Sequence, residues 1–503
     1  MAVARSQRAR HNLGIPTGIH SPIAPVRSCH LSRVPVMPGP RSCTPFANWI
    51  NRRDLLRIGS LGIAATTIPG LRSVSAAPRK PTKVDSVILL WIAGGLTHHE
   101  SFDPKPEAPE EIRGSLGTVT TGLPGIRFSE VMPNLAKSTA DLAVLRTFAA
   151  GSDDHFQAQA RALSGRMVSA AQITTEPNVG AVLSKLHGPR AGFPGYIAVP
   201  GTTRPGPPPK NLFVGGWLGE QYGPFPAGGQ PKNADFTAGV KEASEDEFNR
   251  QGLQPFAGLD DARLANRRSL RDRLDAGLRD AEASGASVHQ YRGAFDMLLS
   301  PTVRNAFDIT KESDATRDEY GRTKIGSRCL LARRLVESGA RYVMVDYGYD
   351  PEYGNLWDNH NAPGQNFPHI CEMAKRPYHV AGVDRAAAAL IADLKRRGRL
   401  GNTLVLLLTE FGRTPKINAN GGRDHWGKTG SIFFAGGGVK GGQVIGTTDK
   451  AGGYPTTPSY TPADVAATVY TALGVDLETL LYDKQNRPFP LVPEGQPIPG
   501  VLG

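Results

Sequence analysis

One apolar run constrains the fold more than any other stretch of the chain. The segment Thr403-Leu-Val-Leu-Leu-Leu408 carries no charge, and such a run is typical of a strand buried on both faces of a parallel sheet. The run ends abruptly at Thr409-Glu410. A carboxylate directly after a buried strand lies where open α/β sheets bind ligands. We therefore predict an α/β fold with a functional site at the carboxyl edge of its sheet.

Other apolar runs repeat this pattern, and helical patterns stand between them. Strands are predicted over 83–92, 142–148, 341–347 and 431–435. Helices with a proline near the start, a glycine at the end or an apolar face are predicted over 132–137, 156–163, 326–338, 380–397 and 461–474. The length of 503 residues accommodates one large α/β domain or two to three average ones. The alternation of strands and helices favours a single domain over 78–503.

The middle of the chain interrupts this alternation. Residues 198–230 are dense in proline and glycine and are interpreted as a surface loop or lid, not core. Residues 258–283 predict a charge-rich amphipathic helix that packs on the outside. We therefore predict an insertion at about 198–323, and no repeat at solenoid periods is found.

Histidines and carboxylates gather just after the predicted strands, in four clusters. Each cluster alone has an ordinary explanation as a polar loop or a helix cap. Four clusters on one side of a predicted sheet are harder to explain that way. The clusters are His98, Glu100 and Asp103; Asp154 and His155; Asp358 and His360; and Glu410 with Asp424 and His425.

These side chains predict a metal site of a particular kind. Mixed histidine and carboxylate ligands without cysteine suit zinc or a similar divalent transition ion, one or two of them, and argue against a structural thiolate site. Two such ions would clamp a phosphate or sulfate ester and activate the attacking water. Arg413, Arg423 and Lys428 are candidates for binding an anionic substrate, although each taken singly is ordinary loop charge.

The N-terminus carries a predicted export signal. Residues 51–57, with Arg52-Arg53 followed by Leu55 and Leu56, resemble a twin-arginine signature, and Val74-Ser-Ala-Ala77 suits a cleavage site. A capped amphipathic helix is the alternative. We predict a leader and signal peptide over 1–77, with translation starting at Met1 or Met37, and an exported mature protein. The apolar stretch over 58–71 is too short for a stable membrane span.

Charge and cysteine content exclude two further classes. The net charge of +12 belongs mainly to residues 1–77, and the rest holds 48 basic and 45 acidic residues, which argues against a nucleic-acid partner. Only Cys329 and Cys371 lie beyond the leader. One disulfide is possible between them, but two buried apolar cysteines are the stronger interpretation.

Several motifs resemble a known superfamily. Met132-Pro-Asn-Leu-Ala followed by Ser164-Gly-Arg166 resembles the sulfatase pattern in which "PNLD-x-L" precedes a nucleophile loop ending in "TGR". The stretch 404–412 is similar to the "SDHG" strand of the alkaline phosphatase superfamily, and 461–474 to a late helix of it. Five further motifs together resemble the sulfatase-like family called domain of unknown function 1501 over most of 84–500. They are 94–105, 357–360, 410–415, 422–426 and 435–442.

The resemblance implies a three-layer α/β/α sandwich of the alkaline phosphatase-like type, with a mostly parallel central sheet and a metal site at its carboxyl edge. The departures from the sulfatase pattern matter as much. His155 stands at the nucleophile position, Gln159 replaces an arginine, and Gly94-Gly95 replaces the paired acids. Glu410-Phe411 replaces Asp-His. The resemblance therefore excludes a formylglycine mechanism.

A metal site remains possible under this resemblance. Its predicted ligands are Asp358, His360, Glu410, Asp424 and His425, with His98 and Glu100 as additions. The attacking group would be a metal-activated hydroxide, with His155 as acid, base or oxyanion partner and Asp154 beside it.

Three functions compete for this site. The first is an exported metal-dependent hydrolase of phosphate or sulfate esters, including polysaccharide esters. The second is a non-catalytic extracytoplasmic binding or assembly protein on the same fold. The third is a redox or other metal enzyme. During export, the twin-arginine translocase would be a partner in each case.

Overall fold

The computed structural model describes residues 84–201, 212–227, 266, 269, 300–348 and 355–503. The predicted leader and signal peptide lie outside the described residues, as does nearly all of the helix predicted over 258–283. The leader, the signal peptide, this helix and the insertion at about 198–323 therefore stay predictions.

An eight-stranded sheet forms the centre of the described chain. Its order is β12-β4-β11-β8-β1-β7-β5-β6, and every neighbouring pair is parallel except the two that β11 makes with β4 and β8. The mostly parallel sheet is therefore confirmed. The strands are β1 (Ser86–Ile92), β4 (Leu142–Phe148), β5 (Ile197–Val199), β6 (Phe225–Pro226), β7 (Tyr342–Asp346), β8 (Thr403–Thr409), β11 (Gly430–Gly436) and β12 (Gln443–Ile445).

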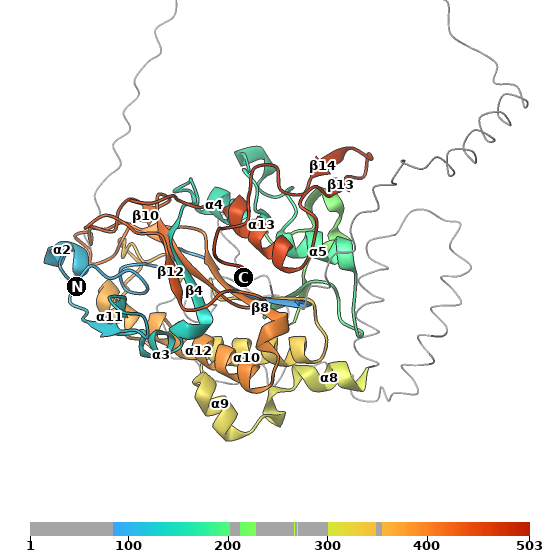
Figure 1. Cartoon of the computed structure of the whole chain (residues 1–503), viewed down its shortest axis with the longest axis horizontal. Helices are drawn as coiled ribbons and strands as arrows, with labels where there is room; N and C mark the ends of the chain where they lie inside the picture. The colour runs from blue at the N-terminus through green and yellow to red at the C-terminus, as the bar shows by residue number, and fades with distance from the viewer. Residues whose placement is uncertain (1–83, 202–211, 228–265, 267–268, 270–299, 349–354) are drawn as a thin grey trace, which may run out of the picture. The chain divides into compact units, whose positions relative to one another are not determined.

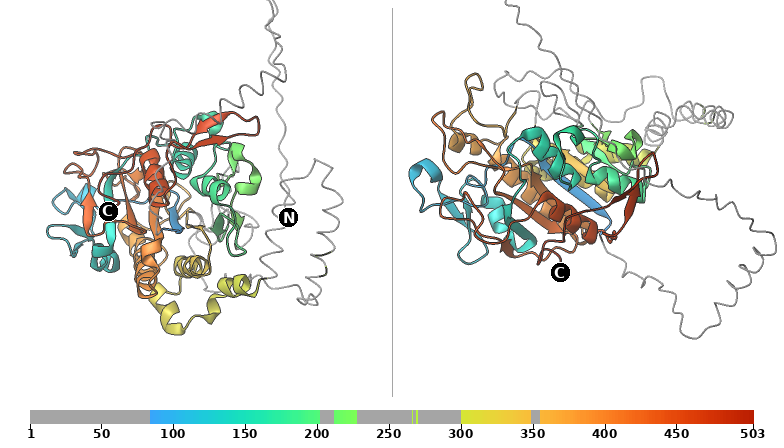
Figure 2. Two further views of the ribbon diagram at one scale, coloured as in Figure 1. Left: turned by 45° about the vertical axis from the view of Figure 1, so that its right-hand side comes forward. Right: turned by 90° about the horizontal axis from the view of Figure 1, so that it is seen from above.

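Helices cover both faces of the sheet, because the central strands are apolar on both sides. In β1, Ile88 and Leu90 belong to one hydrophobic cluster, and Leu89 and Trp91 belong to the other. The first cluster is closed by α3 (Pro133–Lys137), α8 (Pro301–Phe307), α9 (Asp314–Tyr320), α10 (Lys324–Glu337), α11 (Ile370–Ala374) and α12 (Val380–Arg396). The second is closed by α4 (His155–Ser164), α5 (Val179–His187) and α13 (Pro462–Ala472). Figures 1 and 2 show the resulting three layers, and the predicted α/β/α sandwich is confirmed.

Short elements fill the loops around these layers. Three two-stranded pairs are formed by β2 (Thr118–Thr120) with β3 (Arg127–Ser129), β9 (Gly412–Arg413) with β10 (His425–Trp426), and β13 (Leu480–Tyr482) with β14 (Pro488–Pro490). The helix α2 spans Glu110–Arg113. The 3-10 turns are η2 (Thr139–Asp141), η3 (Ala170–Gln172), η4 (Gly216–Leu218), η5 (Glu220–Tyr222), η7 (Ile309–Lys311) and η8 (Leu400–Asn402).

The direction of β11 decides what reaches the carboxyl edge of the sheet. The strands β1, β4, β7 and β8 run in one direction, so the loops after them meet at this edge. Strand β11 runs the other way, and its first residue, Gly430, pairs with Phe148 at the end of β4. The residues before β11, including β10, therefore reach the same edge as the residues after the other strands.

The prediction that 198–230 is a surface loop was wrong for part of this stretch. Its first residues close β5, and Phe225–Pro226 adds β6 at the edge of the sheet. Leu212 and Phe213 are buried in the second hydrophobic cluster. Proline and glycine density hid these elements, because it predicts turns but does not show whether the short segments between turns are buried.

The prediction for the cysteines can also be compared with the structure, whereas the apolar stretch of the leader lies outside the described residues. Cys329 and Cys371 are both buried and neither is in a disulfide, so the interpretation as small apolar side chains is confirmed. Among the described residues, no helix has the length and apolar character that crossing a membrane requires.

Candidate metal centre

Four side chains from three separate elements converge at the carboxyl edge of the sheet. His155 is the first residue of α4, Asp358 and His360 follow β7, and His425 lies in β10. One potential ligand atom from each lies within 4.8 Å of every other. Asp358, His360 and His425 were predicted as ligands, whereas His155 was predicted as a catalytic acid or base.

The spacing of these atoms is close to that of a metal coordination shell. Asp358 Oδ1 lies 3.0 Å from Nε2 of His155, 3.0 Å from Nε2 of His360 and 3.1 Å from Nε2 of His425. The Nε2 atoms of His360 and His425 are 2.8 Å apart. Around a tetrahedral zinc ion with bonds of about 2.0–2.1 Å, ligand atoms are ~3.3 Å apart.

The outer nitrogen of each imidazole is held by an acceptor. His155 Nδ1 contacts Glu410 Oε1, His360 Nδ1 lies 2.8 Å from Asp424 Oδ1, and His425 Nδ1 lies 2.8 Å from the carbonyl of Asp153. A carbonyl can only accept, and so can an ionised carboxylate, so each Nδ1 carries the proton. Each Nε2 then faces the centre, where it can offer its lone pair to a cation. Histidine ligands of metal sites are oriented in this way by carboxylates and carbonyls behind them.

The donor set fits a divalent transition ion. Three imidazole Nε2 atoms and one carboxylate oxygen that face one another are stabilised by a shared cation, either a proton or a metal ion. One buried carboxylate oxygen next to His155, Glu410 Oε2, has no hydrogen-bond partner among the described residues. Zinc, or an ion of similar ligand preference, matches three nitrogen donors and one oxygen donor better than magnesium or calcium does, since those ions prefer oxygen ligands.

The electrostatics of the site also favour a positive charge. Burial lowers the pKa of His155, but the negative charge of Glu410 and the hydrogen bonds to both carboxylates outweigh it and raise this pKa. Burial raises the pKa of Asp358, but hydrogen bonds from the three imidazoles and the charge of Arg413 hold it well below its usual range. Burial lowers the pKa of His425, which keeps it neutral and able to bind a cation. The carboxylates that stabilise a proton on His155 would also stabilise a metal ion.

Two residues predicted as ligands, Glu410 and Asp424, lie behind the histidines and do not face the centre. Each binds the outer nitrogen of a histidine, as described above, and Asp424 is 54% exposed. The sequence grouped them with the ligands because they share a loop with His425. It could not show which carboxylates face the centre and which face the back of an imidazole.

The other two predicted ligands, His98 and Glu100, lie apart from the four side chains. His98 Nε2 lies 2.7 Å from the carbonyl of Gly452, and the neighbouring His99 Nε2 lies 2.8 Å from the carbonyl of Ala451. Glu100 forms a buried ion pair with Arg423, whose Nε lies 2.9 Å from Glu100 Oε2. These residues tie the loop after β1 to its neighbours.

The predicted catalytic and substrate-binding residues take varied positions. Asp154 is exposed and caps α4, its Oδ1 accepting a hydrogen bond of 2.8 Å from Gln157 N. Arg413 and Arg423 are 2% and 0% exposed and are bound to protein carboxylates. Lys428 is exposed. Of the three predicted cationic contacts, Lys428 alone has its side chain at the surface.

Two contributions to the site escaped sequence reasoning. The carbonyl of Asp153 fixes His425, and a backbone acceptor has no signature in a sequence. The position of His155 as the first residue of α4 could have been weighed as a ligand position. Helix starts at the carboxyl edge of a sheet point toward bound groups.

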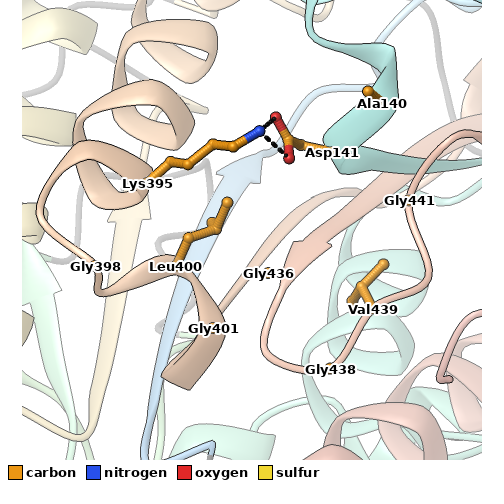
Figure 3. A pocket seen from close by; sticks show the side chains of 10 residues that line it. All are labelled: Ala140, Asp141, Lys395, Gly398, Leu400, Gly401, Gly436, Gly438, Val439 and Gly441. Atoms are coloured by element: carbon orange, nitrogen blue, oxygen red, sulfur yellow. Dashed lines mark hydrogen bonds and ion pairs between the residues drawn. The ribbon is translucent and has the colours of Figure 1, made fainter.

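The opposite edge of the sheet holds a cavity of about 350 Å³. Lys395 reaches across it to Asp141, with 2.8 Å from Nζ to each carboxylate oxygen, and the glycine-rich turn that follows β11 closes one side (Figure 3). The cavity lies between the end of α12, η8 and this turn, at the end of β11 away from the four converging side chains.

The fold and the site together define an α/β/α protein with a three-histidine, one-carboxylate metal-type centre at the carboxyl edge of its sheet. Residues 84–502 match the model of the family described as "Protein of unknown function (DUF1501)", and the chain belongs to this family. No curated protein matches the chain.

Several solved structures are similar to the chain at low identity. The phosphonate monoester hydrolase of Agrobacterium radiobacter is 12% identical with a TM-score of 0.35, over 78% of this chain and 74% of that one. Alkaline phosphatase from the Antarctic bacterium TAB5 is 11% identical with a TM-score of 0.33, over 78% and 99%. PsFucS1 sulfatase from Pseudoalteromonas sp. is 13% identical with a TM-score of 0.32, over 78% and 68%. The chemistry of the site therefore rests on its own residues.

Proposed function

We propose that the chain is an exported, metal-dependent hydrolase of phosphate or sulfate esters that works without a formylglycine nucleophile. The observation that carries this proposal is the convergence of three imidazole Nε2 atoms on Asp358 Oδ1, with every Nδ1 held from behind. Packing alone does not require three histidines to face one carboxylate oxygen in this way. Export rests on the signature at 51–57.

A bound ion of this type supplies Lewis acidity and lowers the pKa of water near it. The residues of the chain do the rest. Glu410 and Asp424 hold the Nδ1 protons, so the histidines keep their lone pairs turned inward. In this proposal His155 is a ligand, although the sequence suggested an acid or base. In this proposal Lys428, which is exposed and three residues after His425 in the sequence, is the candidate cation for an anionic ester.

Metal analysis tests the proposal first. Purified protein comprising residues 78–503 is expected to carry about one equivalent of a transition ion, and an Asp424→Ala/His425→Ala double variant is expected to lose it. His98→Asn is the matched control, because His98 bonds a carbonyl away from the centre. A panel of phosphate and sulfate monoesters, including sulfated polysaccharides, should then show turnover in the metal-loaded protein and none in the double variant.

One observation favours the alternative of a non-catalytic binding or assembly protein. Arg413 and Arg423 are buried against Asp358 and Glu100, so neither offers its guanidinium to an anionic substrate. A protein that holds its ion but hydrolyses no ester in the panel would support this alternative. A protein that stays metal-free after reconstitution would overturn the hydrolase proposal.

A further inference from the structure

Arg413 lies at the point where three loops of the carboxyl edge meet. Its side chain is 2% exposed, and all three of its nitrogens donate hydrogen bonds. Backbone carbonyls accept most of these bonds. They belong to Gly94 and Gly95 after β1, to Trp357 after β7, and to Arg423 just before β10.

The sequence around Arg413 is shaped to admit the guanidinium. Gly94 and Gly95 have φ of +112° and +92°, a region that side chains disfavour. A Cβ on Gly95 would lie 2.8 Å from Arg413 Nε, and one on Gly94 would lie 2.8 Å from Trp357 Cβ. The glycine pair after β1 therefore lets two backbone carbonyls close around Arg413.

One contact of Arg413 reaches the candidate metal centre itself. Its Nη2 lies 2.9 Å from Asp358 Oδ1, the same oxygen that faces the three imidazoles. A carboxylate can rotate and can offer either oxygen, and a guanidinium in a fixed position removes this freedom. A buried arginine also requires a charge partner, and Asp358 is the carboxylate that it contacts.

We propose that Arg413 is a positioning residue of the metal centre, one that holds Asp358 Oδ1 toward the three histidines. This inference rests on the proposed function, because it assigns Arg413 a role toward the same ion. It also gives Arg413 a different task from the one expected from sequence, where it was a contact for substrate.

Arg423 provides a matched comparison within the same loops. It is also fully buried, it pairs with Glu100, and it donates to the carbonyls of Thr414 and Ile112. None of its side-chain contacts is with His155, Asp358, His360 or His425 among the described residues. Arg423 therefore has the burial and charge of Arg413 without the contact to a ligand.

The experiment compares Arg413→Lys with Arg423→Lys, since lysine keeps the charge and loses the planar fork. Cobalt(II) affinity is measured by competition with a chelator, together with the visible absorption of bound cobalt and the thermal unfolding of the metal-free proteins. We expect Arg413→Lys to bind cobalt about 10–100-fold more weakly with an altered spectrum, the cost typical of losing a partner behind a ligand. Arg423→Lys is expected to lower the melting temperature while leaving both metal readouts unchanged.

The outcomes separate the two proposals. Wild-type protein that binds neither cobalt nor zinc overturns the proposed function. Wild-type protein that binds cobalt, with an unchanged affinity and spectrum in Arg413→Lys or an equal loss in Arg423→Lys, overturns the positioning role alone. If Arg413→Lys does not fold, Arg413→Gln, which is neutral and keeps two N–H donors on one nitrogen, is measured against the same two results.

Discussion

Two groups of histidines lie near the carboxyl edge of the sheet, and they are used in opposite ways. His155, His360 and His425 turn their Nε2 atoms toward one carboxylate oxygen and have acceptors at Nδ1. His98 and His99 instead have their Nε2 atoms on the carbonyls of Gly452 and Ala451, and their buried Nδ1 atoms have no partner among the described residues. The sequence predicted a ligand role for His98 as it did for His360 and His425.

The difference teaches that the outer partner of an imidazole identifies its role better than its neighbours in sequence do. Where an acceptor holds Nδ1, the other nitrogen is left to bind a cation. Where Nε2 donates to a backbone carbonyl, the ring joins two loops, and burial keeps it neutral. The following predictions test this comparison.

The largest effect is expected from removing the shared carboxylate. Asp358→Ala takes away the one oxygen that all three imidazoles face, and it leaves Arg413 without its charge partner. We expect metal affinity to fall by more than ~100-fold, beyond the loss typical of residues behind the ligands. Titration with zinc against a chromophoric chelator measures it. Unchanged affinity would show that the ion, if bound, lies elsewhere.

Removing an acceptor behind a ligand should have a smaller effect. Glu410→Gln replaces a fully buried carboxylate with a neutral amide against His155 Nδ1. A loss of about 10–100-fold in zinc affinity is expected, because the imidazole becomes a poorer donor and its orientation is less fixed. Asp424→Asn, at a more exposed position, should lose less by the same titration. The reverse order would contradict the assignment.

The second group of histidines predicts an effect on stability and pH dependence. Burial, followed by the charges of His98 and Arg423, holds the pKa of His99 well below its ordinary value in the folded state. The unfolded chain takes up this proton below about pH 6.5, so acidification favours unfolding by up to ~1.4 kcal/mol per pH unit for one such group.

His99→Gln should remove that contribution while its amide keeps a donor for Ala451 O. Denaturant unfolding of metal-free protein at pH 7, 6 and 5 measures the difference. We expect the free energy of unfolding to fall less steeply with acid in the variant than in the wild type, and zinc affinity at pH 7 to stay unchanged. Equal slopes would show that His99 does not stay neutral.

The smallest effect is expected at Asp154, which the sequence suggested as catalytic. Its side chain caps α4, so Asp154→Ala should lower the free energy of unfolding by about 1 kcal/mol. Metal affinity should not change, because the side chain accepts from Gln157 N and from no ligand. Asp154→Asn, which keeps a capping oxygen, is the control. A loss of ester turnover in both variants would restore the catalytic role.

Much of the fold could be predicted from the sequence, because the long strands of the sheet each contain a run of four or more apolar residues. The predicted strands over 142–148 and 341–347 match β4 and β7 within one residue at either end. The short strands β5 and β12 were missed, since three-residue strands within glycine- and proline-rich stretches have no period to detect.

The sequence predicted where the candidate site lies, but not which residues face its centre and which lie behind the histidines. Residue types at strand ends indicated which side chains meet at the edge. Which of them face the centre depends on rotamers and on loop paths that bring Asp358 and His425 together across 67 residues of sequence. The roles of Arg413 and of the Asp153 carbonyl depend on backbone positions, which composition does not record.

The antiparallel strand β11 has a consequence for how the protein is made. Because the segment before it supplies the last histidine, the contact between His425 and the carbonyl of Asp153 joins residues 272 apart in the chain. Most of the domain must therefore be synthesised and leave the ribosome before the four side chains can meet. Metal content in a preparation would then report completed folding, and truncated or arrested chains would be expected to carry none.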